Sequence, residues 1–240
     1  MNYSAAWAYM LLGQLIEGEQ AARTALEKAQ QHGVVGAQGW SYLVSAFIAI
    51  QAGHWDEAKL AGDNAYAVAG MLHDADLQSR VLWSRSVCAG WQGDWTRAIS
   101  DILAAIQVAQ HESETLLVYP YLLMQAAKAY FFAGKSTQAR FYLDQGMELA
   151  HNRQYRQLPA IGQRLQGRVY QAQGKYDEAK PCFERSLAEL LALDDVVEYA
   201  RAQEAYGLFF LARKIKGDVE LGRELIKRAQ GTFKRLGVNG

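Results

Sequence analysis

The chain has 240 residues, half of them apolar, and carries 25 Lys or Arg against 25 Asp or Glu. A formal net charge of zero provides no overall field for attracting nucleic acid or an anionic membrane surface. Its two cysteines, Cys88 and Cys182, lie far apart and outside any metal-ligand spacing, as is typical of a reduced intracellular chain. The start does not read as a signal peptide, and no apolar run approaches the roughly 20 residues that cross a bilayer. We therefore expect a cytoplasmic protein.

Apolar residues recur with helical spacing along the whole chain. The pattern predicts eleven helices preceded by a partial one. In chain order they cover residues 3–12, 15–31, 34–52, 56–71, 75–92, 96–110, 115–133, 136–150, 156–173, 177–192, 196–214 and 219–235.

A glycine separates the two helices of each successive pair. These glycines recur at intervals of 40, 40, 41, 40 and 43 residues, and they are Gly13, Gly53, Gly93, Gly134, Gly174 and Gly217. The residue five positions after each glycine is always Ala or Gly, and the residue twelve positions after is Ala, Gly or Ser. Both offsets fall on one face of the following helix, so that face is expected to press closely against a neighbour. A repeat array of this kind builds a surface rather than a single enclosed active site.

Three of the turns share a more specific pattern. In the segments 53–58, 93–98 and 174–179, a glycine is followed two residues later by an aromatic residue and five residues later by alanine. This pattern resembles the inter-helix signature of tetratricopeptide repeats. The period of about 40 residues exceeds the usual 34, and in this it is similar to helical-repeat regions of large bacterial signalling ATPases and maltose-activator-type transcription regulators. A HEAT or armadillo array would suit the period but not the turn.

The resemblance covers essentially the whole chain and implies an all-α fold. The expected architecture is a right-handed superhelical solenoid of about six antiparallel helix pairs, forming a single domain over residues 1–240. Neither end carries an obvious polar capping helix, which complete solenoids usually need. We therefore expect either that the chain is a segment of a larger protein or that one end meets a partner.

The resemblance also implies that the first helix of each pair lines a concave inner face. The side chains expected there form a partner-binding groove: Trp7, Trp40, Phe47, Arg80, Trp83, Trp91, Tyr121, Lys128, Phe131, Arg164 and Arg168. The first part of this set is mainly aromatic and the last part is basic. Solvent-facing tryptophans favour binding sites, and the alternative is that neighbouring first helices bury these rings. Arg164 and Arg168 either receive a carboxylate or phosphate or face Glu204.

No motif for catalysis is present. The sequence lacks a phosphate-binding loop, a dinucleotide fingerprint, a zinc-hydrolase pattern and a nucleophile elbow. We expect no enzyme activity, no catalytic residue, no metal and no cofactor. The predicted function is a non-catalytic scaffold that binds a protein or peptide in its aromatic groove, without direct contact to nucleic acid or membrane. The alternatives are an effector-sensing regulatory region of a larger signal-transduction ATPase, cyclase or transcription activator, and a self-associating scaffold.

Overall fold

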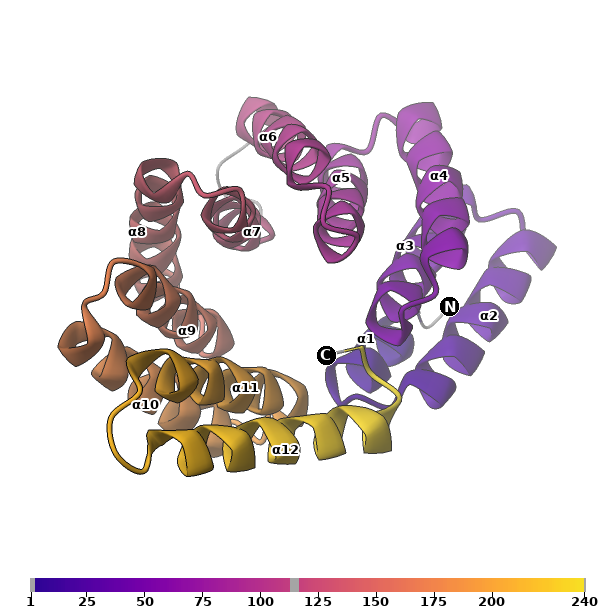
Figure 1. Cartoon of the computed structure of the whole chain (residues 1–240). Helices are drawn as coiled ribbons and strands as arrows, with labels where there is room; N and C mark the ends of the chain where they lie inside the picture. The colour runs from indigo at the N-terminus through magenta and orange to yellow at the C-terminus, as the bar shows by residue number, and fades with distance from the viewer. Residues whose placement is uncertain (1–2, 113–116, 240) are drawn as a thin grey trace.

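The computed structural model describes residues 3–112 and 117–239, and within them it contains twelve α-helices and no strand (Figure 1). The helices are α1 (Tyr3–Leu11), α2 (Leu15–Gln31), α3 (Val35–Ala52), α4 (Trp55–Leu72), α5 (Ala75–Trp91), α6 (Trp95–Glu112), α7 (Tyr119–Phe132), α8 (Ser136–Asn152), α9 (Gln157–Ala172), α10 (Tyr176–Ala192), α11 (Val196–Arg213) and α12 (Asp218–Leu236).

The expected helices match these bounds to within two residues, with one exception. The seventh was expected from residue 115, but the described helix begins at Tyr119, and residues 115–116 lie outside the described part. Pro120 occupies the first turn of α7. A missing N–H costs no intrahelical hydrogen bond there, so this proline suits a helix start.

Successive helices pack as six antiparallel hairpins, α1–α2 through α11–α12, and each odd-numbered helix also contacts the next odd-numbered one. Figure 1 shows the odd-numbered helices on the inside of a ring and the even-numbered helices on the outside. The inner layer therefore consists of the first helix of each hairpin. The expectation of an all-α solenoid of about six helix pairs, of the tetratricopeptide-repeat type, is confirmed.

Five of the six recurring glycines, here called the marker glycines, close the inner helices, whereas α11 ends at Lys214 with φ 57° and the sixth glycine, Gly217, lies directly before α12. Gly53 ends α3 with φ 78°, a left-handed conformation that costs glycine little. Its N–H donates to the Ile50 carbonyl at 3.2 Å, and the His54 N–H donates to the Ala49 carbonyl at 2.8 Å. These bonds satisfy carbonyls at the helix end and turn the chain sharply into α4.

The small residues five and twelve positions after each glycine, here called the two columns, lie at buried helix contacts. All twelve members are buried: Gly18, Ala58, Ala98, Ala139, Ala179 and Gly222 in the first column, and Ala25, Ala65, Ala105, Gly146, Ser186 and Ala229 in the second. The closest approach is at Gly222, where an added Cβ would lie 2.8 Å from the Gly207 carbonyl oxygen. The small side chains thus allow the two helices of a hairpin to approach closely.

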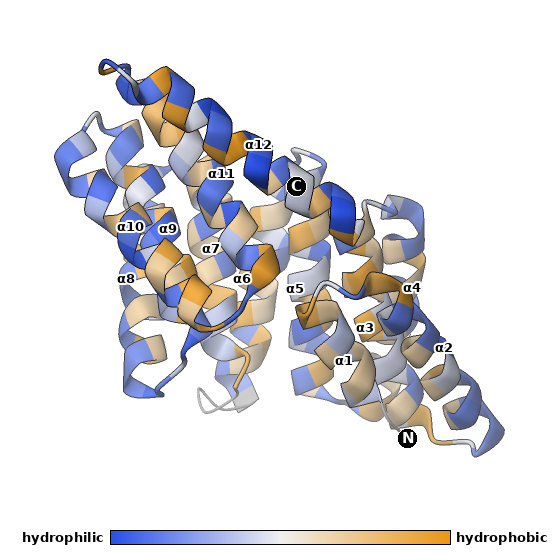
Figure 2. Cartoon of the chain, turned by 90° about the horizontal axis from the view of Figure 1, so that it is seen from below, coloured by the Kyte–Doolittle hydropathy of each residue, from blue (hydrophilic) through white to orange (hydrophobic). Residues whose placement is uncertain are grey.

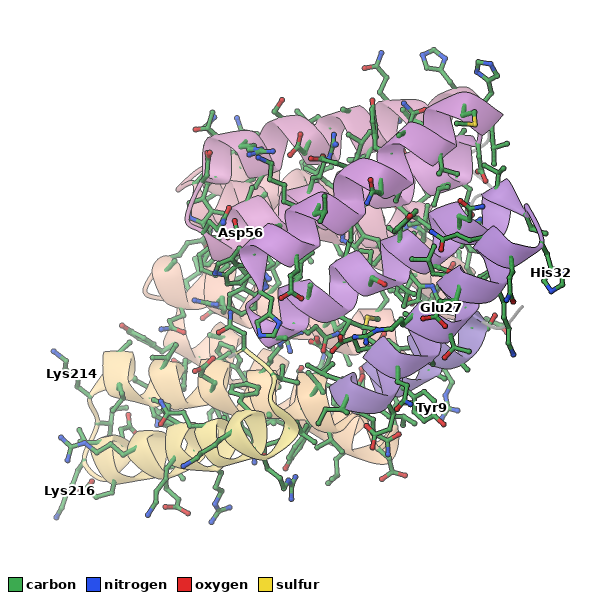
Figure 3. The ribbon with its side chains drawn as sticks, turned by 90° about the vertical axis from the view of Figure 1, so that its right-hand side faces the viewer. Tyr9, Glu27, His32, Asp56, Lys214 and Lys216 are labelled. Carbon is green, nitrogen blue, oxygen red and sulfur yellow. The ribbon has the colours of Figure 1, made fainter. Side chains whose placement is uncertain are left out.

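The two ends of the array meet and close the ring. An added Cβ on Gly13 would lie 3.0 Å from Leu236 Cδ1 and 3.1 Å from Val197 Cγ2. The Asn239 N–H donates to the Gln51 carbonyl at 2.5 Å. In Figure 3 the segment after α12 reaches the hairpin that carries Asp56, while Lys214 and Lys216 project from the turn before α12, at the opposite end of that helix. We call this junction of the first and last repeats the seam.

Helix α12 is suited to its position across the seam. Figure 2 shows alternating hydrophilic and hydrophobic segments along it as it crosses toward the first repeats. Phe233 and Val238 are buried in the same apolar cluster as Ala6, Met10 and Phe47 of the first two hairpins. The apolar side chains at the two ends of the array therefore cover one another.

Candidate functional site

Aromatic rings on the inner helices form a continuous series, here called the aromatic ladder. Its members, in order, are Trp7, Phe47, Trp83, Tyr121 and Tyr155. Successive ring centroids lie 5.4, 4.9, 5.7 and 5.6 Å apart, a range in which tilted and edge-to-face pairs are favourable. The first four rings come from α1, α3, α5 and α7, and Tyr155 lies in the turn just before α9, so the ladder crosses five successive repeats.

The ladder is half-buried rather than fully exposed. Phe47 is only 7% exposed, and the other four rings have intermediate exposure. Beside the ladder, Trp40 stacks on Tyr3 at 5.8 Å, and the Arg80 guanidinium lies 5.5 Å from the Trp40 ring centroid. Neighbouring inner helices therefore cover part of each ring, and the rest of each ring other than Phe47 is accessible to solvent.

A second group of inner side chains, here called the charged cluster, lies on α7, α9 and α11. Its members are Lys128, Arg164, Arg168, Glu198 and Arg201. Glu198 is its centre, because Arg164 Nη2 donates to one carboxylate oxygen at 2.6 Å and Arg201 Nη1 donates to the other at 2.6 Å. Arg164 Nη1 also donates to the Glu198 carbonyl at 3.0 Å.

The charged side chains of this cluster are largely buried, and burial and their neighbours shift the pKa values of some of them. The side chains of Arg164 and Glu198 are 15% and 13% exposed. Burial by itself raises the pKa of the Glu198 carboxyl, but Arg164 and Arg201 and their hydrogen bonds outweigh it and lower the pKa to about 2. Glu198 is therefore ionised at neutral pH.

Lys128 has no such partner. It forms no hydrogen bond or ion pair with any described residue, and its ammonium instead lies 5.2 Å from the Trp91 ring centroid. Burial, followed by the charges of Arg201 and Arg164, lowers the pKa of Lys128 to about 7, with Glu198 acting in the opposite sense.

The charged cluster also joins helices that are not neighbours around the ring. Arg201 of α11 lies 5.8 Å from the centroid of Trp91 on α5. Arg168 covers Phe131 and Phe132 at 5.5 and 4.6 Å, and burial, then the charge of Arg164, lowers its pKa. Side chains from opposite walls thus meet inside the ring at this level.

All eleven expected groove residues lie on odd-numbered helices, and none of them is fully exposed. The structure sorts them into the ladder region and the charged cluster, with Trp91 between the two. Arg164 was considered as facing Glu204, but it pairs with Glu198, and it is Arg168 whose pKa Glu204 raises. Sequence reasoning missed Glu198 and Arg201, although their spacing of three on an inner helix signals a shared face.

Two hollows lie away from the inner face. A cavity of about 360 Å³ between α1 and α2 is lined by residues that include Tyr9, Glu17 and Lys28, and Figure 3 places Tyr9 at this outer edge. A second, of about 340 Å³, lies beside the turns after α5 and α7 and includes Trp95 and Lys135. Neither contains a side chain that was expected to bind a partner.

Comparisons with known proteins support the repeat fold. The model of the tetratricopeptide repeat family matches residues 165–188. The crystal structure of the apo form of RapI is 12% identical, with a TM-score of 0.77 over 97% of this chain and 83% of that one. BtubC (BKLC) from P. vanneervenii is 19% identical, with a TM-score of 0.65 over 92% of each chain. A comparison with curated protein sequences gave no match.

Two further structures were solved as a complex or as part of a larger protein. A Rap protein complexed with Competence and Sporulation Factor is 11% identical, with a TM-score of 0.76 over 98% of this chain and 65% of that one. A signal transduction ATPase with a tetratricopeptide repeat sensor, from Pyrococcus horikoshii, is 14% identical, with a TM-score of 0.61 over 96% of this chain and 39% of that one. At these identities the likeness concerns the fold, which is that of tetratricopeptide-type repeat proteins.

Neither a metal site nor a membrane span is found in the described residues. They contain no group of three or more His, Cys, Asp or Glu side chains placed to hold a metal ion. Among the helices of residues 3–112 and 117–239, none combines the length and apolar character needed to cross a membrane.

Proposed function

We propose that the inner face of the ring binds a protein or peptide along the aromatic ladder. The observation that carries this proposal is the unbroken series of rings from Trp7 to Tyr155, of which all but the buried Phe47 are half-buried. Rings held by their neighbours present apolar area at little additional cost in side-chain entropy, which is the property of interface hot spots. The complex of a Rap protein with Competence and Sporulation Factor supports this choice of ligand class.

The test uses peptides selected for binding to the wild-type chain. Tyr121→Ala removes a ladder ring, whereas Phe141→Ala removes an aromatic side chain that is 57% exposed on the outer helix α8. The selected peptides should lose at least tenfold in affinity for Tyr121→Ala and retain it for Phe141→Ala. Equal affinity for both variants, measured on protein whose folding is checked by circular dichroism, would rule out the ladder as the binding surface.

A second candidate function is a sensor region within a larger signal-transduction ATPase, cyclase or transcription activator. Its support is the ATPase from Pyrococcus horikoshii, in which the repeat sensor is part of a longer chain. In this proposal residues 1–240 form one domain of a larger cytoplasmic protein, and the inner face binds an effector or another domain of the same protein. The intact gene product should then contain a nucleotide-hydrolysing or DNA-binding domain whose activity changes when the inner face is occupied.

We further infer that the chain is a non-catalytic scaffold that contacts neither nucleic acid nor membrane directly. The balance of 25 cationic and 25 anionic side chains supports this. A self-associating scaffold is the remaining alternative, and light scattering at several concentrations distinguishes it, because a constant monomer mass would exclude it.

A further inference from the structure

Lys128 of α7 is a lysine without an anionic partner. It is partly accessible to solvent, yet it forms no hydrogen bond or ion pair with any described residue. Its nitrogen lies 5.2 Å from the centroid of the Trp91 ring, which comes from α5. A lysine that is poorly solvated and unpaired gives up its proton more readily than an exposed one, and its neutral amine is a nucleophile.

The groups that act on Lys128 disfavour its ammonium form. Burial is the largest influence, and the charges of Arg201 on α11 and Arg164 on α9 come next. Arg168 acts in the same sense and Glu198 in the opposite one, so the pKa of Lys128 falls to about 7. A large share of this side chain is therefore an uncharged amine at neutral pH, whereas an exposed lysine with a pKa of about 10.4 is almost fully protonated.

An anion would suit this position better than the ammonium group. Of the four charged groups that act on Lys128, three are positive and one is negative. Burial opposes an anion as it opposes a cation. Glu198 shows, however, that the arginines outweigh burial for an anion in this cluster, because they hold the pKa of its carboxyl at about 2.

We propose that the ε-amine of Lys128 is a modification site for carbon dioxide, which it binds covalently as a carbamate. The nitrogen lone pair attacks the carbon of CO2 and forms an N–C bond. One C–O π bond opens to place its electron pair on oxygen, and the nitrogen releases one proton to the solvent. The step needs no oxidant, reductant or further reactant. It replaces the positive charge of the ammonium form by a negative one, which the charges of Arg201 and Arg164 stabilise.

The surroundings of Lys128 favour a small and uncharged reactant. The side chain is only partly accessible, and it lines neither of the two hollows described above. Carbon dioxide has three atoms and no charge, so neither burial nor the neighbouring arginines oppose its approach. This inference does not depend on binding of a peptide along the aromatic ladder.

The experiment exposes the protein to carbon-13-labelled carbon dioxide at pH 7.5 and traps carbamates with triethyloxonium ion, which ethylates the carbamate oxygen. Mass spectrometry of a digest then locates the ethoxycarbonyl group at each lysine, and it reads the α-amino group of the chain on a separate peptide. The variant is Lys128→Arg, which keeps a cation but forms no stable carbamate. Its matched control is Lys227→Arg, which changes an exposed lysine of α12.

The wild-type protein should carry at least tenfold more label at Lys128 than at Lys227. Lys227→Arg should keep the label at Lys128, and Lys128→Arg should lose it. At a constant pressure of carbon dioxide, the label at Lys128 should increase as the pH rises from 6 to 8. The reason is that carbamate formation consumes the neutral amine and releases a proton.

The comparison of Lys128 with Lys227 within the wild-type protein does not require a variant to fold. Equal label at the two lysines would overturn the proposal. Competitive labelling with acetic anhydride identifies the step that is wrong. If acetylation is no faster at Lys128 than at Lys227, the amine is protonated or out of reach. If acetylation is faster at Lys128 but carbon dioxide leaves no label there, the amine is a nucleophile and the carbamate site is wrong.

Discussion

At the scale of single residues, Glu198 shows how a largely buried charge on an inner helix is stabilised. Its carboxylate receives a guanidinium on each oxygen, which compensates for the loss of water. Arg164 and Arg201 come from different hairpins, α9–α10 and α11–α12, so Glu198 also ties two repeats together. Removing it would leave both arginines without their main anion.

We predict that Glu198→Gln lowers the free energy of unfolding at pH 7. A pKa of about 2 in place of 4.5 corresponds to about 3 kcal/mol. Because the folded carboxyl has the lower pKa, its contribution is complete above pH 4.5 and is lost as the pH falls toward 2. Urea unfolding at pH 7 and at pH 3 would measure this.

The matched control is Glu224→Gln, which removes an exposed i, i+4 pair with Arg228. Such pairs are worth less than about 1 kcal/mol, so this variant should unfold like the wild type. A Glu198→Gln protein as stable as the control would show that the ion pairs contribute nothing net.

A second prediction at the residue scale concerns the energy of contact between two rings of the aromatic ladder. Phe47 and Trp83 have ring centroids 4.9 Å apart in an edge-to-face arrangement. A double-mutant cycle with alanine at both positions should give a coupling energy of about 1 kcal/mol, as for other aromatic pairs. The distant Phe47 and Phe183, which belong to separate apolar clusters, serve as the control pair and should be additive. If the effects of alanine at Phe47 and at Trp83 on the free energy of unfolding are additive, the two rings do not stabilise each other and the ladder is not an energetic unit.

At the scale of the helix hairpin, the small residues decide how closely two helices approach. Ala58 is 4% exposed and lies at a helix contact, whereas Ala67 on the same helix α4 is exposed. Ala58→Leu should therefore lower the free energy of unfolding by about 1–3 kcal/mol through overpacking. Ala67→Leu should leave it within about 0.5 kcal/mol. Thermal unfolding of the two proteins compares them directly, and equal melting temperatures would contradict the close contact.

The hairpins are the part of the fold that could be predicted from the sequence. Helical spacing predicts each helix, the marker glycines predict the turns, and the two columns of small residues predict the contact faces, because all three depend on residues that are close in the sequence. The start of α7 was the main departure. The apolar residues before Tyr119 continue the helical pattern, but Val118 precedes the helix, and Pro120 lies where a helix begins.

The candidate site was predictable only within single helices. Positions such as Trp83 and Lys128 follow from counting back from the glycines. Arg201 was missed because its partner ring, Trp91, comes from a helix on the other side of the ring. Contacts across the ring depend on its curvature, and no local spacing records them.

At the scale of the whole molecule, the repeats alone do not determine that the first and last hairpins meet and close the ring. Each hairpin adds a small rotation, and six of them bring the last helix back to the first. The seam is narrower than a hairpin interface. Its residues from the last repeat include Val197, Phe233, Leu236, Val238 and Asn239, which lie against the first two hairpins. It also leaves Gln51 Oε1 buried without a hydrogen-bond partner among the described residues.

The seam should therefore open before the rest of the array. Val238 is 6% exposed at the seam, so Val238→Asp would bury a carboxylate there. The control, Leu221→Asp, changes a side chain of α12 that is 47% exposed. In hydrogen exchange, Val238→Asp should lose protection in α1–α2 and in the last turns of α12 while α5–α8 remain protected.

An open ring also has a larger radius of gyration, which small-angle scattering would detect for Val238→Asp and not for Leu221→Asp. The reason is physical: neighbour contacts hold the interior repeats on both sides, but the terminal repeats depend on the seam for their second contact. If Val238→Asp instead unfolds all twelve helices in one step, or leaves the exchange pattern unchanged, the ring does not have its weakest contact at the seam. An extended partner would then have to enter the inner face along the ring axis rather than through an opened seam.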